Sequence, residues 1–162
     1  MDHDADPARV ESVWDYPRPP AVRAVNEHVE VWFGGALVAS TRAGLQVLET
    51  SHPPTYYLPK AEFRSGTLVP VPGTTFCEFK GHAEYFDVVV GERSAPRAGW
   101  HYPDAVGAYA VLRDHVAVMP GAMDRCTVDG EVVRAQEGGF YGGWITSRVR
   151  GPFKGAPGTR GW

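Results

Sequence analysis

The residues Thr74–Tyr85, TTFCEFKGHAEY, decide the fold of this chain, because they are typical of a β-hairpin bent at its glycine. Strand alternation places Cys77 on one face and Lys80 on the other, so only a bulge or the bend itself can bring them together. If residues 80–82 form the turn, Cys77 lies across from Tyr85. The span carries a thiol, an amine, an imidazole, a phenol and two carboxylates. We therefore expect a functional site here.

Glycine and proline punctuate the rest of the chain, which contains 19 Gly, 14 Pro and 12% aromatic residues. Because Gly and Pro interrupt helices and aromatic residues favour strands, this composition predicts many short strands. Two further hairpins are expected, one at Gly34-Gly35 and one at Asp129-Gly130. Leu68–Gly73 contains two prolines, so it is an edge strand at most. Asp104 is expected to cap the best helix candidate, Ala105–Leu112.

The 162 residues fit one domain, which we place at residues 10–162 behind a flexible, acidic leader of residues 1–9. A net charge of −3 gives no basic field, so no nucleic-acid partner is expected. No apolar run approaches the ~20 residues that cross a bilayer, and no signal-peptide core is present, so we expect a cytoplasmic protein without a membrane partner.

The two cysteines, Cys77 and Cys126, lack CxxC spacing. One disulfide remains an alternative, whereas a cysteine-clamped zinc site would lack ligands.

Glu49 is the main candidate outside the central hairpin. Leu45, Val47 and Glu49 occupy alternate positions of a predicted strand and therefore point to the same face. This puts a carboxylate in line with two core-facing residues. A buried carboxylate is costly unless it is paired or hydrogen-bonded, so Glu49 either ends the strand at the sheet edge or has a partner. Lys80 can be that partner if aromatic loops enclose it, and is a solvated surface residue if they do not.

Cys77 has two interpretations. A nearby cation such as Lys80 can lower the pKa of a thiol and make it a nucleophile, but free cysteine is among the most buried residue types and usually only packs.

The chain has no HExxH, no GxSxG and no glycine-rich phosphate loop, and its histidines are isolated. We therefore expect neither a metal site nor a cofactor.

Three segments taken together resemble the family catalogued as domain of unknown function 427: TSHPPTYYLP at 50–59, TTFCEFKGHAEYFDV at 74–88 and GWHYPDA at 99–105. Members of that family show an ETxxPxxYYxP-like stretch, a TxCxxKGxAxY core and an AWxYPxP-like segment. The chain departs from the pattern at Gly99, where alanine is usual, and at Glu78, where proline is frequent. The resemblance covers nearly the whole predicted domain.

The resemblance implies an all-β, β-tent-like domain: two small antiparallel sheets pinned together at one end, with one short helix and long loops. Related β-tents bind zinc on paired CxxC motifs, which this chain lacks, so the resemblance implies a metal-free domain held by aromatic packing. The family also carries a nucleotidyltransferase-like label. We rank that activity last, because nucleotidyl transfer normally uses clustered carboxylates to hold Mg²⁺ and no Asp-x-Asp pattern occurs in the three segments.

We expect a concave pocket between the two sheets, since an apolar wall with a few convergent polar groups is the usual make-up of a small-molecule site. The expected aromatic walls are Tyr57, Trp100, Tyr102, Trp32 and Trp144. The expected polar floor is Glu49, Lys80, Cys77 and Tyr85.

Two classes of function fit this pocket. In the first, the chain is an enzyme that performs acid–base chemistry on a small organic molecule, with Lys80 and Glu49 transferring protons or holding substrate and Tyr57 as donor. In the second, it is a non-catalytic module whose aromatic residues cage a planar or cationic ligand. A third interpretation is that these residues only build the core. A homodimer is compatible with the sequence.

Overall fold

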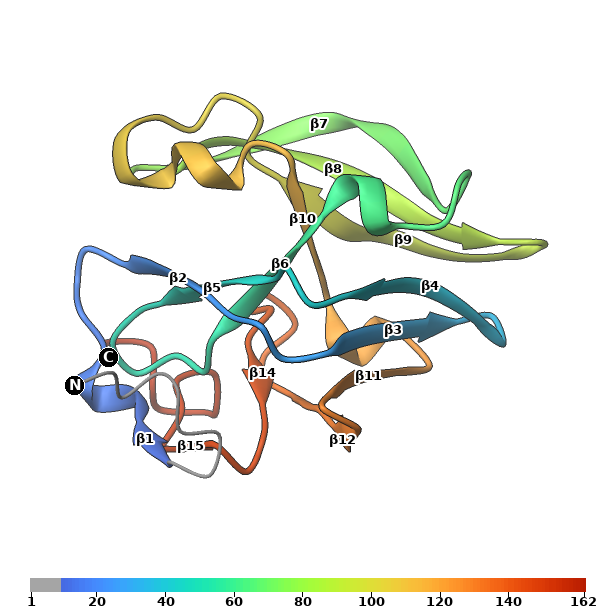
Figure 1. Cartoon of the computed structure of the whole chain (residues 1–162). Coiled ribbons are helices and arrows are strands. Elements are labelled where there is room, and N and C mark those ends of the chain that lie inside the picture. The colour runs from blue at the N-terminus through green and yellow to red at the C-terminus, as the bar shows by residue number, and fades with distance from the viewer. Residues whose placement is uncertain (1–9) are drawn as a thin grey trace.

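The computed structural model describes residues 10–162, so the leader expected at residues 1–9 lies outside the described residues (Figure 1). The strands are β1 (Glu11–Ser12), β2 (Ala21–Ala24), β3 (Val29–Phe33), β4 (Ala36–Thr41), β5 (Leu45–Leu48), β6 (Thr55–Pro59), β7 (Leu68–Cys77), β8 (Gly81–Val90), β9 (Arg93–His101), β10 (His115–Val118), β11 (Arg125–Val128), β12 (Glu131–Val132), β13 (Arg134–Ala135), β14 (Trp144–Ile145) and β15 (Val149–Arg150). The short 3₁₀ helices are η2 (Val13–Asp15), η3 (Lys60–Glu62), η4 (Gly107–Leu112) and η5 (Pro120–Ala122).

Two antiparallel sheets make up most of the fold, which confirms the all-β class. The larger sheet has seven strands in the order β2-β5-β6-β10-β9-β8-β7, and the smaller has four in the order β12-β11-β3-β4. In Figure 1, β7, β8 and β9 lie above β3 and β4, with β6 and β10 running between these two levels. Two further pairs complete the described part of the chain: antiparallel β13–β14 and parallel β1–β15.

The two glycine-containing turns form as predicted. Gly34 and Gly35, with φ of 61° and 78°, join β3 to β4, and Asp129 and Gly130, with φ of 48° and 84°, join β11 to β12. Positive φ at both central positions is what a two-residue hairpin turn of matching twist requires. These turns set the pairing of β3 with β4 and of β11 with β12 next to each turn.

The central hairpin also forms, but its predicted register is wrong. Residues 78–80 make the turn, so Cys77 pairs with Gly81, while Tyr85 pairs with Val71. Gly81 has a positive φ of 91°. This left-handed conformation is typical of the residue that directly follows a three-residue hairpin loop, and not of the middle of the turn. As predicted, the proline-containing segment is at an edge, because β7 is the last strand of the seven-stranded sheet.

The predicted helix at Ala105–Leu112 is wrong in type and in start. The structure has the 3₁₀ helix η4, which begins after Val106 and has no side-chain cap, so Asp104 does not cap it. Gly107 has φ of 60°, a left-handed conformation that an α-helix cannot continue through. Residues 10–162 contain no helix long and apolar enough to span a membrane.

The seven-stranded sheet buries side chains on both faces. Tyr56 and Leu58 of β6 belong to the main core, which also contains Val31 and Val38 from the smaller sheet. Tyr57 lies between them in sequence and belongs to a second cluster on the other face, with Leu112 of η4. Strand alternation accounts for this division. Apolar side chains thus fill the interface between the two sheets, where the concave pocket was expected.

Matched valines in the smaller sheet test the main core. Val31→Ala should lower the free energy of unfolding by about 2 kcal/mol, because Val31 is 0% exposed and truncation leaves a cavity. Val132→Ala in the same sheet should change it by less than about 0.5 kcal/mol, because Val132 is 59% exposed. Chemical denaturation measures both, and equal effects would contradict the packing described here.

Candidate functional site

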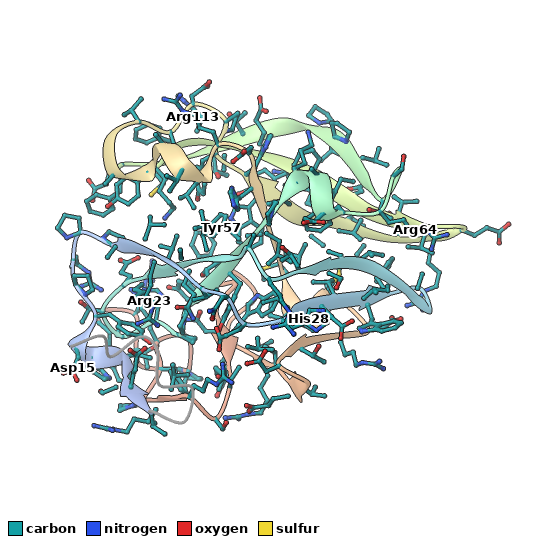
Figure 2. The ribbon with its side chains drawn as sticks, in the orientation of Figure 1. Asp15, Arg23, His28, Tyr57, Arg64 and Arg113 are labelled. Atoms are coloured by element: carbon teal, nitrogen blue, oxygen red, sulfur yellow. The ribbon has the colours of Figure 1, made fainter. Side chains whose placement is uncertain are left out.

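Four aromatic side chains predicted to form a site cluster on the face of the seven-stranded sheet that η4 covers. Trp100 of β9 pairs with Tyr85 of β8 on one side and with Ala117 of β10 on the other, so all three point the same way. Tyr57 and Tyr102 pack in the same cluster. In Figure 2, Tyr57 lies between η4 and β5. We call Tyr57, Tyr85, Trp100 and Tyr102 the phenol face.

A chain of hydrogen bonds runs through this face. The Trp100 Nε1–H donates to the Tyr57 hydroxyl over 3.4 Å, and Tyr57 is hydrogen-bonded in turn to Tyr102. Burial raises the pKa of Tyr57 well above its ordinary value of 10.0. Burial also raises the pKa of Tyr102, with a further contribution from Cys77. Both phenols therefore keep their protons at neutral pH and act as hydrogen-bond donors.

The central hairpin brings Lys80 and Cys77 to the phenol face together. The Lys80 Nζ lies 5.3 Å from the centroid of the Tyr102 ring, in the range of a cation–π contact. Cys77 packs against the same cluster and is half-buried. Strict alternation would have separated the two residues. They converge because Lys80 belongs to the turn and Cys77 is the last residue of the strand.

Glu49 lies directly after β5 and has a partner, but that partner is Arg18. The Arg18 Nε and the Glu49 carboxylate are 3.5 Å apart, and Lys80 makes no ion pair with Glu49 among the described residues. His52 lies within electrostatic range of all three. Burial is the largest cause that lowers the pKa of His52. The charge of Glu49 raises this pKa, and the charges of Arg18 and Lys80 lower it further. Glu49 and Lys80 therefore flank one imidazole without touching each other.

Trp144 and Trp32 lie away from the phenol face. Trp144 is fully buried in the main core, where its ring centroid is 4.8 Å from that of Tyr56. Trp32 is on β3 in the smaller sheet, with the Arg125 guanidinium 4.6 Å from its ring centroid. Neither position was evident from sequence, because the pattern identifies strands but not which sheet or face each joins.

Tyr109 is a member of the cluster that sequence reasoning missed. It comes from η4, packs against the phenol face and donates its hydroxyl proton to the Pro20 carbonyl over 2.7 Å. Burial is the main cause that raises the pKa of Tyr109, and the charges of Cys77 and Glu49 raise it further. The segment had been interpreted as an apolar helix, so the single phenol within it gave no separate signal.

A groove of about 280 Å³ is a second missed feature, on the edge of the larger sheet at β7. Four ionisable side chains line it: Lys60, Glu84, His101 and Tyr85, the last of which also belongs to the phenol face. Glu84 and His101 are 17 positions apart and meet because β8 and β9 pair at that register. The sequence contains no motif that joins them.

Among residues 10–162, no group of three or more His, Cys, Asp or Glu side chains is placed to hold a metal ion. Both cysteines are free, so the disulfide that the sequence left open is not formed. The polar groups around the phenol face are phenols, one ammonium group, one thiol and one paired carboxylate. These groups suit proton donation and the binding of an anionic oxygen.

His52 should make stability depend on pH. Its pKa in the folded state is below the ordinary 6.5, so the unfolded chain binds the proton more readily. The free energy of unfolding should therefore fall as pH drops below 6.5 and level off below the folded-state pKa. His52→Gln should remove this step from denaturation curves recorded across pH, whereas the exposed His82→Gln should retain it. An unchanged step in His52→Gln would contradict the assignment.

The two thiols should differ in reactivity. Burial raises the pKa of Cys126 to about 12, and this residue is 1% exposed, whereas Cys77 is half-exposed at the hairpin end. At neutral pH a thiol reagent should label one cysteine in the native protein and two after unfolding. Mass spectrometry counts the labels. Cys77→Ser should abolish native labelling, and rapid native labelling of Cys126 in that variant would show that the core is more open than described.

Comparison with known proteins places most of these residues in one family. A family model labelled NTP_transf_9 and described as "Domain of unknown function (DUF427)" matches residues 21–129. The match covers about two thirds of the chain, from β2 to the end of β11, and includes the phenol face, Glu49, Cys77 and Lys80. No curated protein matches the chain. The chain belongs to the DUF427 family, as its sequence segments predicted.

Proposed function

We propose that the chain binds a small organic molecule at the phenol face and performs acid–base chemistry on it. The hydrogen-bonded series Trp100–Tyr57–Tyr102, with the Lys80 ammonium group above the last ring, is the observation that carries this proposal. Lys80 has no carboxylate partner among the described residues. It is therefore available to a negatively charged group of the ligand.

The phenols supply proton donors for an oxygen that gains negative charge. Because burial keeps both phenols protonated, Tyr57 can donate its single O–H to Tyr102, and Tyr102 can donate its own O–H to a carbonyl oxygen of the ligand. Tyr57 already accepts a hydrogen bond from Trp100, which polarises its own O–H toward Tyr102. Stabilisation of an oxyanion in this way favours removal of a proton from the neighbouring carbon.

Glu49 is the proton acceptor in this proposal. It takes the proton from the carbon next to the carbonyl group, and the Tyr102 hydroxyl, supported by Tyr57, holds the resulting enolate oxygen. Return of the proton completes an isomerisation or exchange. Arg18 orients the Glu49 carboxylate at 3.5 Å. Lys80 holds the substrate by an anionic group. The reaction class is proton transfer next to a carbonyl group.

A non-catalytic module remains the second candidate, but not as a cage for a cation. The protein's own cations already lie over the rings: the Arg97 guanidinium is 4.2 Å from the Tyr85 centroid, and Lys80 lies over Tyr102. A cationic ligand would have to displace them against like charge. A planar anion that binds between these cations fits the same residues better.

Lys80→Met tests the proposal, because it removes the ammonium group and nearly preserves the length of the side chain. We expect loss of ligand binding and turnover with a change in unfolding free energy below about 1 kcal/mol, since Lys80 is only half-buried. Purified protein incubated with a metabolite extract provides the measurement. Consumption of a compound supports the enzyme, and a bound but unchanged compound supports the module.

Lys60→Met is the matched control, since Lys60 is an exposed lysine that does not belong to the phenol-face cluster. It should leave unchanged the consumption or binding of the compound that the Lys80→Met variant loses. A large fall in melting temperature for Lys80→Met, with ligand binding intact, would instead mean that Lys80 serves only the packing of Tyr102.

A further inference from the structure

The groove at β7 is formed by an irregularity of the outer hairpin. Val71 pairs with Tyr85 and Thr74 pairs with Glu84, so two residues of β7 have no partner in the ladder. This bulge bends the edge strand away from β8. Residues 70–74 line one side of the resulting groove, and its volume is about 280 Å³. Such a space suits a ligand smaller than a typical drug molecule.

Charges of both signs line this groove without neutralising each other. Lys60, at the start of η3, has its Nζ 5.2 Å from the centroid of the Phe86 ring. It makes no ion pair with Glu84 or with any other carboxylate of the described residues. Glu84 contacts His101 instead, with its Oε1 3.1 Å from the His101 Nε2. The groove therefore presents an unpaired cation and an accessible carboxylate at separate positions.

His101 fixes the position of Glu84 at the wall of the groove. Its ring is held by Glu84 at Nε2 and by an edge contact with Phe86, with 4.7 Å between ring centroids. Its Nδ1 is buried and has no hydrogen-bond partner in the described part of the chain.

We propose that this groove binds a small zwitterion of the α-amino acid class. The carboxylate of the ligand pairs with Lys60, and its ammonium group donates to Glu84, which the His101 imidazole orients. The Phe86 ring and the prolines of the bulge form the apolar contact for the ligand side chain. The two charge-bearing contacts of this site differ from those of the phenol face: Lys60 lies over Phe86 of the main core, whereas Lys80 lies over Tyr102 of the second cluster, and Tyr85 alone borders both places. The proposal does not depend on the function of the phenol face.

Amide-resolved NMR titration of the whole chain tests this proposal. The twenty common amino acids are screened first, and the best binder is compared with its carboxamide and its N-acetyl derivative. We expect saturable shifts at Glu84, Phe86 and His101 with the free amino acid. Each derivative should bind about tenfold more weakly, because each lacks one of the two charges. Absence of saturable shifts with every amino acid would overturn the proposal.

Two lysine variants separate this site from the phenol face. Lys60→Met should weaken amino-acid binding about tenfold, whereas Lys80→Met should leave it unchanged. Glu84→Gln should weaken binding of the free amino acid and leave that of the N-acetyl derivative unchanged. Lys60 and Glu84 are exposed, and a dispersed amide spectrum verifies that each variant is folded. Equal binding of the amino acid and its N-acetyl derivative to the native protein would exclude a zwitterion site.

Discussion

The division of the seven-stranded sheet into two faces depends on two adjacent tyrosines of β6. Tyr56 enters the main core, where its hydroxyl bonds to Gln46 at 2.9 Å and to Glu27 at 3.2 Å. Tyr57, one residue later, enters the phenol face. A slip of one residue in β6 would turn each ring to the opposite face of the sheet and remove it from its hydrogen-bond network. The register of a single strand therefore determines both the packing of the sheets and the composition of the candidate site.

Sequence reasoning succeeded where the determining chemistry was local. Gly34-Gly35 and Asp129-Gly130 specify their turns by positive φ alone, and both hairpins formed. The same reasoning failed where one glycine permitted two conformations. Gly81 was assigned to the middle of a turn although it begins the returning strand, and Gly107 interrupts the segment that apolar spacing predicted as a helix.

The candidate site was predictable in part. Lys80, Cys77 and Tyr102 are assembled by the hairpin and the strand beside it, so their sequence order implied their proximity. The partner of Glu49 was not predictable, because Arg18 lies on a separate segment and no pattern links the two residues. The position of Trp144 was not predictable either, because it depends on packing between distant segments of the chain.

The segments outside the family match supply charges around Glu49. Arg18 precedes the matched region, Lys154 follows it, and both act on His52. The Lys154 backbone amide donates to the carbonyl of Ser51, which anchors the later segment on the same loop. The matched region thus carries the phenols, while its flanks supply charges around Glu49 and His52. An exchange of these flanking segments would therefore change the charge around Glu49 and His52 while leaving every aromatic residue of the phenol face in place.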